Sequence, residues 1–281
     1  MECVVKDVPV YYQTCGEGRP LVVLPGWTVD HRWPMAELEP IFAQRCAWRR
    51  IYLDLPGRGK TPARDWITHQ DHVLDILLGF IDRVLPRERF TLAGLSHGGY
   101  LARAIVHERL PWVDGLLLIV PVTEPHVQRR ERPAHVTLVR EQALQAELTP
   151  REAEQLKASA VMESRRFLER LRNVVLPAVD MADHAFLNRL RPNYVLSFDV
   201  DDLPHPFPGP TLILAGRQDA DVGYQDAWRL LDRYPRATFA VLDRAGHYLP
   251  VEQLRLFHTL VEEWLDRVEE SWEGRDGQRD R

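Results

Sequence analysis

The sequence predicts an α/β fold in which helices flank a parallel sheet. Three observations lead to this prediction. Short apolar segments alternate with segments of helical periodicity through the first 120 residues. Their intervals are those of parallel β-α-β units, and the same alternation returns after residue 210. A chain of 281 residues with 45% hydrophobic residues is also long and apolar enough to bury a substantial core.

The predicted strands are short apolar segments bounded by glycine and proline. The first alternates in character over 8–13 and is followed by a glycine-containing turn at 16–18. The segment 113–120 is almost wholly apolar, as expected for a strand that is buried on both faces of a sheet. In chain order, the predicted strands cover 8–13, 20–24, 50–54, 90–93, 113–120, 211–215 and 238–242.

Segments with helical spacing lie between these strands. The clearest is 69–85, where apolar residues recur on one helical face. Further helices of the same domain are expected at 33–47, 99–109, 224–233 and 251–268. The tail at 269–281 is polar and has little apolar surface to bury, so we expect it to fray.

The composition changes between the two regions of alternation. Long charged helices are expected here, at 140–147, 150–172 and 183–190. A stiff proline-rich segment at 203–210 then leads back to the strand pattern. The predicted domains are therefore a core formed by 1–120 and 211–268, a helical insertion at 121–210, and the tail at 269–281.

Charge and hydropathy exclude several classes of partner. The formal net charge is -5, so the chain has no broad positive field that would hold nucleic acid. No window approaches 18 uncharged apolar residues, and no basic region followed by a long apolar segment begins the chain. We expect a cytoplasmic protein that acts on a small molecule and binds neither nucleic acid nor membrane.

The pentapeptide GLSHG at 94–98 is the strongest chemical signal. It follows the predicted strand 90–93 and precedes a predicted helix, so Ser96 lies on a sharp strand-to-helix turn, a nucleophile elbow. Such a turn exposes the hydroxyl and places a helix N-terminus behind it, which favours nucleophilic attack. The flanking glycines fit because side chains there would collide with the strand and the helix.

A serine nucleophile needs a histidine base and a carboxylate that orients the histidine. Asp219 and His247 each come just after a predicted strand, and the carboxyl ends of parallel strands share one rim of a sheet. Asp221 lies in the same loop as Asp219, so either carboxylate could reach the imidazole. The position at the strand end favours Asp219. The chain order is Ser96, Asp219, His247.

This order and five motifs resemble the α/β-hydrolase superfamily along nearly the whole chain. The motifs are LPGW at 24–27, DLPGRG at 54–59, GLSHGG at 94–99, GRQD at 216–219 and AGH at 245–247. The resemblance implies an eight-stranded, mostly parallel sheet and a helical cap formed by 121–210 over the active site. One departure is the Pro-Gly pair at 25–26, where many relatives carry His-Gly.

The resemblance also implies the role of each residue. Ser96 attacks a carbonyl carbon, His247 accepts and returns the proton, and Asp219 fixes the imidazole tautomer. The backbone N–H groups of Trp27 and His97 form the oxyanion hole. We expect the side chain of His97 to be a pocket wall, because no carboxylate partner is evident beside it.

No cofactor and no metal ion are expected. Asp54 with Gly57 and Gly59 offers one carboxylate and no phosphate-loop lysine, so we interpret it as a tight structural loop. The histidines of the insertion lack the i, i+4 spacing of zinc sites; they are His126, His135, His184 and His205.

The predicted function is a serine hydrolase, of the carboxylic-ester hydrolase type, that cleaves a small ester, lactone, thioester or activated C–C bond through an acyl-enzyme. Serine at 96 argues against the dehalogenases and epoxide hydrolases of the superfamily, which use aspartate there. Two alternatives remain open. One is a small-ligand-binding signalling protein with slow or no turnover on the same fold, and the other is an aminopeptidase-like amide hydrolase.

Overall fold

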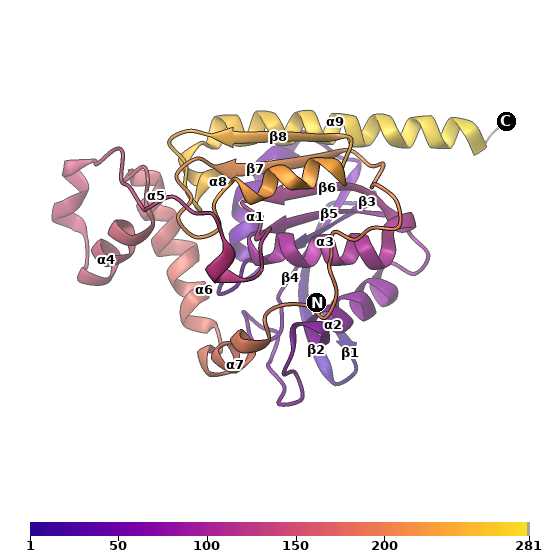
Figure 1. The fold of residues 1–281 in the computed structure, drawn as a ribbon, viewed down its shortest axis with the longest axis horizontal. Coiled ribbons are helices and arrows are strands. Elements are labelled where there is room, and N and C mark those ends of the chain that lie inside the picture. Colours follow the sequence, from indigo (N-terminus) through magenta and orange to yellow (C-terminus); the bar gives the residue numbers. More distant parts are fainter. Residues whose placement is uncertain (280–281) are drawn as a thin grey trace.

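An eight-stranded sheet forms the centre of the computed structural model, which describes the backbone of residues 1–279 and the side chains of residues 1–273 (Figure 1). The strand order is β1-β2-β4-β3-β5-β6-β7-β8. Strand β2 runs antiparallel to both neighbours, and the other pairs are parallel. The predicted α/β class and eight-stranded, mostly parallel sheet are thus confirmed. The strands are β1 (Glu2–Val5), β2 (Val8–Cys15), β3 (Arg19–Leu24), β4 (Trp48–Leu53), β5 (Phe90–Leu95), β6 (Val113–Ile119), β7 (Thr211–Gly216) and β8 (Ala237–Leu242).

Helices cover both faces of the sheet. Successive residues of β5 face opposite layers of helices. Leu92 belongs to the core shared with α2 (Gln70–Val84) and α3 (His97–Arg109). Ala93 belongs to the core shared with α1 (Arg32–Leu38) and α9 (Leu254–Arg279). The central strands are therefore buried on both sides, which explains their continuous apolar sequence.

The segment between β6 and β7 consists of short helices. The helix predicted over 183–190 is present as α7, and a 3-10 helix covers most of 140–147, but the one predicted over 150–172 is broken. Figure 1 shows α4 and α5 projecting beside one end of the sheet. The predicted helix 150–172 is interrupted because Ala160 closes α4 and Ser164 caps α5 by accepting a hydrogen bond from the Phe167 N–H. The helices here are α4 (Pro150–Ser159), α5 (Arg165–Arg170), α6 (Leu176–Met181) and α7 (His184–Leu190), and α8 (Leu249–Glu252) precedes α9.

Short turns of 3-10 and π-helix complete the secondary structure. The predicted helix 33–47 changes to 3-10 geometry after α1, at a point where Pro40 provides no N–H for the ladder. The 3-10 segments are Glu39–Gln44, Leu110–Trp112, Val127–Arg129, Gln142–Glu147, Arg191–Asn193 and Asp226–Asp232, and the π-helical turn is Leu171–Val175.

The prediction of a frayed tail from residue 269 was wrong for the residues that the structure describes. Helix α9 continues to Arg279 and extends past the sheet (Figure 1). Trp272 supplies apolar surface in this part of the chain. Its side chain is buried, its ring centroid lies 4.5 Å from that of Trp48, and the Arg19 guanidinium stacks on it. Residues 280 and 281 lie outside the described part of the chain.

Within residues 1–279, no helix combines the length and the apolar character needed to cross a lipid bilayer.

Candidate active site

Ser96 occupies the turn between β5 and α3. Its backbone is in an unusual conformation, with φ at 53° and ψ at -115°. The neighbouring glycines permit this turn by their size: a Cβ atom on Gly94 would lie 2.3 Å from the Gly98 carbonyl oxygen, and one on Gly98 would lie 2.4 Å from that of Leu24. The elbow therefore requires glycine at both positions, and strain of this kind is typical of functional turns.

Three residues predicted from separate motifs are brought together at this turn. The Nε2 atom of His247 lies 2.9 Å from Oγ of Ser96, and its Nδ1 atom lies 2.9 Å from Oδ2 of Asp219. Asp219 follows β7 and His247 follows β8, so the carboxyl ends of parallel strands converge as expected. Both distances are those of hydrogen bonds, so the three side chains form one connected set.

The alternative between Asp219 and Asp221 is resolved in favour of contact with Asp219. The Asp219 side chain is fully buried, and its Oδ1 atom accepts hydrogen bonds from the backbone N–H groups of Asp221 (2.8 Å) and Val222 (3.0 Å). The Asp221 residue is exposed and its carboxylate makes no hydrogen bond to His247 among the described residues. One carboxylate oxygen of Asp219 thus anchors the loop while the other faces the imidazole.

The surroundings of His247 favour its charged form. Burial lowers the pKa of His247, but the charge and hydrogen bond of Asp219 and the charge of Asp221 outweigh it, so the pKa rises to about 9. The charge of Arg130 acts in the opposite direction. Stabilisation of the imidazolium is what proton transfer from a serine hydroxyl requires.

Of the two predicted oxyanion donors, His97 directly follows Ser96, and Trp27 follows Gly26, which packs near Ser96. His97 begins α3, where first-turn N–H groups have no intrahelical acceptor. Trp27 lies in the loop after β3, and the Trp27 N–H donates to no other described residue. A Cβ atom on Gly26 would lie 3.8 Å from Cβ of Ser96, so this loop is packed against the nucleophile.

The side chain of His97 contributes to an aromatic wall beside the serine. Its ring is buried and lies 4.9 Å from the ring of Trp27 and 5.1 Å from that of Tyr194, centroid to centroid. Its Nε2 atom contacts Nε2 of Gln70 at 2.9 Å. Burial, with smaller contributions from nearby arginine charges, holds the pKa of His97 well below its usual range. The imidazole is therefore neutral and packed between aromatic rings.

Several residues at the site were not predicted from the sequence. Glu252 on α8 accepts hydrogen bonds from the N–H groups of Gly246 (2.7 Å) and Val161 (2.7 Å), so it joins the His247 loop to the 121–210 segment. Tyr194 is one of eight tyrosines in the sequence, and nothing in the pattern distinguishes it or Gln70. Only the folded chain shows that these side chains meet.

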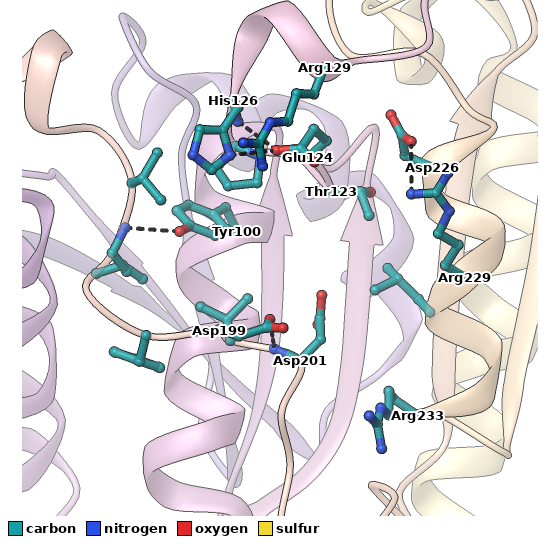
Figure 2. Close-up of a pocket in the computed structure, with 16 residues that line it drawn as sticks. Tyr100, Thr123, Glu124, His126, Arg129, Asp199, Asp201, Asp226, Arg229 and Arg233 are labelled. Carbon is teal, nitrogen blue, oxygen red and sulfur yellow. Dashed lines mark hydrogen bonds and ion pairs between the residues drawn. The ribbon is translucent and has the colours of Figure 1, made fainter.

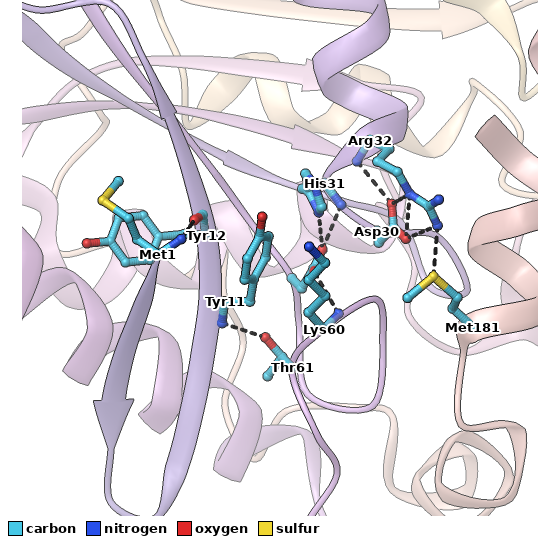
Figure 3. Close-up of polar contacts among 10 residues, drawn as sticks. Met1, Tyr11, Tyr12, Asp30, His31, Arg32, Lys60, Thr61 and Met181 are labelled. Atoms are coloured by element: carbon cyan, nitrogen blue, oxygen red, sulfur yellow. Dashed lines mark hydrogen bonds and ion pairs between the residues drawn. The ribbon is translucent and has the colours of Figure 1, made fainter. Parts of the chain in front are cut away.

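Among the residues that the structure describes, two groups of histidine and aspartate have ligand atoms within 4.8 Å of one another, as a metal site would require. One is the group at Ser96, formed by Asp219, Asp221 and His247. The other group consists of Asp30, His31 and Asp54. Its carboxylate oxygens already accept hydrogen bonds from neighbouring residues. Asp54 accepts hydrogen bonds from His31 N (2.8 Å), His31 Nδ1 (2.8 Å) and Lys60 N (2.9 Å). Figure 3 shows Asp30 facing Arg32. Asp54 is thus engaged in a tight loop, as its sequence pattern predicted.

A cavity of about 560 Å³ lies beside α3 (Figure 2). Acidic and basic side chains surround it, including the neighbouring Asp226 and Arg229. Residues from four parts of the chain line it, among them Tyr100, Thr123, Leu196 and Leu230. Ser96 and His247 are not among its lining residues, so this cavity is separate from the nucleophile.

Comparison with known proteins agrees with this architecture. Residues 21–257 match the alpha/beta hydrolase family. A curated relative, the pimeloyl-[acyl-carrier protein] methyl ester esterase of Legionella pneumophila (strain Paris), is 35% identical over 106 residues, which cover 37% of this chain and 38% of the esterase. The match therefore spans less than half of that enzyme.

Two further similarities extend over most of the chain. The 2-hydroxy-6-oxononadienedioate/2-hydroxy-6-oxononatrienedioate hydrolase 1 of Dechloromonas aromatica (strain RCB) is 25% identical over 272 residues, covering 92% of this chain and 91% of that enzyme. The crystal structure of an alpha/beta superfamily hydrolase from Oenococcus oeni PSU-1 has a TM-score of 0.85 and 26% identity, with 92% of this chain and 96% of that chain covered. With the family match spanning most of its length, the chain belongs to the alpha/beta hydrolase family.

Proposed function

We propose that this protein is a serine hydrolase that cleaves a small acyl compound through an acyl-enzyme on Ser96. The observation that carries the proposal is the continuous hydrogen-bonded set of Ser96, His247 and Asp219, with 2.9 Å at each step. A free serine hydroxyl is a weak nucleophile, and a base at this distance is what activates it.

The reaction has two halves. In the first, Oγ of Ser96 attacks the carbonyl carbon while Nε2 of His247 accepts the hydroxyl proton. The N–H groups of Trp27 and His97 hold the oxygen as it becomes negative. His247 then protonates the leaving group, and the acyl group remains on Ser96. In the second half His247 activates a water molecule that releases the acid.

We propose that the 121–210 segment is the cap over this site. Tyr194 comes from this segment and packs against Trp27 and His97 next to the nucleophile. Val161 also lies in this segment. Its N–H donates to the carboxylate of Glu252, which also accepts a hydrogen bond from Gly246 in the loop that carries His247. These contacts join the segment to the site at two points, so it is well placed to select the substrate.

The proposed substrates are esters, lactones, thioesters and activated C–C bonds with small acyl groups. All four present an electrophilic carbonyl carbon and a leaving group that His247 can protonate. The named activities of the relatives, a methyl ester esterase and a hydrolase of a 2-hydroxy-6-oxo dienedioate, lie within this range. They support the range without selecting within it.

A paired assay tests the proposal. Wild type and S96A are compared on p-nitrophenyl esters of increasing acyl length and on a vinylogous keto-enol acid, and both proteins are treated with a fluorophosphonate probe. We expect wild-type turnover on at least one substrate class, loss of it in S96A, and labelling at Ser96. Equal rates for both proteins throughout, with no labelling of the folded wild type, would favour a ligand-binding signalling protein instead.

A further inference from the structure

Arg58 is buried against the loop that carries Trp27. It lies in the DLPGRG loop after β4 and is only 1% exposed. Its Nε atom donates to the carbonyl oxygen of Trp27 at 2.8 Å, and its Nη1 atom donates to that of Pro56 at 2.7 Å. The guanidinium also lies 4.7 Å from the centre of the Trp27 ring. Arg58 therefore holds Trp27 by both its backbone and its side chain.

Among the described residues, the Arg58 guanidinium has no anionic partner. Both of its hydrogen-bond acceptors are neutral carbonyl groups, and no ion pair in that part of the chain includes Arg58. Burial lowers the pKa of Arg58 to about 9, so the guanidinium is charged below that pH. Its Nη2 atom is buried without a hydrogen-bond partner. Arg103, which is buried to the same extent, pairs with Asp201. A buried charge without a counter-charge is costly, and such groups are concentrated at functional sites.

We propose that Arg58 is a positioning residue for the oxyanion site: it fixes Trp27 so that its N–H faces the reacting oxygen, and it keeps this region positively charged. The inference rests on the proposed function, because Trp27 is a donor only if Ser96 forms a tetrahedral adduct. Its physical basis is a pair of contacts: the hydrogen bond from Arg58 to the Trp27 carbonyl and the stacking of the guanidinium on the Trp27 ring. In a site shielded from water, an unpaired positive charge stabilises a nearby oxyanion more strongly than it would in solvent.

The contacts of Arg58 with Trp27 stabilise the transition state more than the bound substrate. The neutral carbonyl oxygen of a bound ester gains little from a positive charge, whereas the tetrahedral oxyanion gains much. Loss of Arg58 should therefore lower kcat and leave KM nearly unchanged. Removal of a whole oxyanion donor costs about a hundredfold to a thousandfold in kcat, so misplacing one donor should cost about tenfold to a hundredfold.

Three variants test this on the p-nitrophenyl ester that wild type hydrolyses best. R58M should lose about tenfold to a hundredfold in kcat with KM within about threefold. R58K keeps the positive charge and a hydrogen-bond donor, so its kcat should lie between those of R58M and wild type. R50M is the matched control, since Arg50 is also buried but pairs with Glu39 and the Trp48 carbonyl; its kcat should equal that of wild type.

A second measurement is independent of turnover. In protein labelled with ¹⁵N-tryptophan, the amide signal of Trp27 should shift or broaden in R58M, recover partly in R58K and stay unchanged in R50M. An unchanged Trp27 signal in R58M, or a moved signal with unchanged kcat, would overturn the proposal. If R58M does not fold, the same comparison is made with R58K, which should show smaller changes in kcat and in the Trp27 signal. Equal rates for wild type and S96A would overturn the proposed function alone. The amide signal of Trp27 would still show whether Arg58 positions Trp27.

Discussion

Nδ1 of His247 lies 2.9 Å from Oδ2 of Asp219, and the second oxygen of that carboxylate is held by two backbone N–H groups. The carboxylate therefore cannot rotate away without breaking bonds to its own loop. This fixes the orientation of the imidazole and leaves its Nε2 atom directed at Ser96. The charge of Asp221, two residues further on, also raises the pKa of His247, but its carboxylate makes no hydrogen bond to the imidazole among the described residues.

The first prediction separates the two aspartates. D219N should lower kcat by about ten thousandfold, the loss seen for the same change in serine proteases, because the amide stabilises the wrong imidazole tautomer. D221N should keep kcat within about threefold at the optimum pH, because an exposed charge that makes no hydrogen bond to His247 contributes little. Steady-state kinetics on one ester, with circular dichroism to confirm folding, measures both. A larger loss in D221N than in D219N would reverse the assignment.

The second prediction concerns pH. His247 must be neutral to accept the serine proton, and its pKa is raised to about 9. The rising limb of the kcat/KM profile should therefore lie near pH 9 instead of near the ordinary histidine value, with kcat/KM increasing about tenfold per pH unit below it. Rates of S96A, measured in parallel, remove the contribution of alkaline hydrolysis. A limb at the ordinary histidine value would contradict the raised pKa.

Two substitutions should move this limb in opposite directions. Asp221 raises the pKa of His247, so D221N should shift the limb to lower pH. Arg130 lowers the pKa of His247 and donates hydrogen bonds to the carbonyls of Glu124 and Asp221, so R130Q should shift the limb to higher pH. Shifts of equal sign would show that at least one of the two charges does not act on His247 as expected.

The sequence predicted the central part of the site because the fold makes distant motifs converge. Ser96, Asp219 and His247 each follow a strand, and parallel strands carry such residues to one rim. The choice between Asp219 and Asp221 needed the structure, because both lie in one loop and only the loop conformation decides which carboxylate faces inward. Glu252 escaped prediction since its role depends on two segments that meet only in the folded chain.

The errors in the fold have equally local causes. Strand β1 has only four residues, too few for a pattern of period two to stand out. The helix expected over 150–172 contains no glycine or proline after Pro150, yet residues 161 and 162 leave helical geometry because their N–H groups bind Glu252. A tertiary contact here overrides helix propensity, which is a weak preference.

The third prediction concerns the end of the chain, where Trp272 anchors α9. W272A should lower the free energy of unfolding by about 3 kcal/mol, since it removes a buried aromatic ring that packs against Trp48. The control is W228A, because Trp228 is 63% exposed, and its loss should cost less than about 1 kcal/mol. Urea unfolding followed by circular dichroism measures both. Equal stabilities of wild type and W272A would mean that this part of α9 contributes nothing to the fold.

The last prediction uses two glycines that surround the nucleophile. A Cβ atom on Gly98 would lie 2.4 Å from the carbonyl oxygen of Leu24, a rigid backbone atom of a central strand. A Cβ atom on Gly26 would meet a methyl group of Val29 at 3.1 Å, and that side chain can rotate. G98A should therefore destabilise the protein by about 3 kcal/mol, while G26A should cost less than about 1 kcal/mol. Urea unfolding of both variants distinguishes them, and similar losses would mean that the elbow can move away from β3 more easily than its packing indicates.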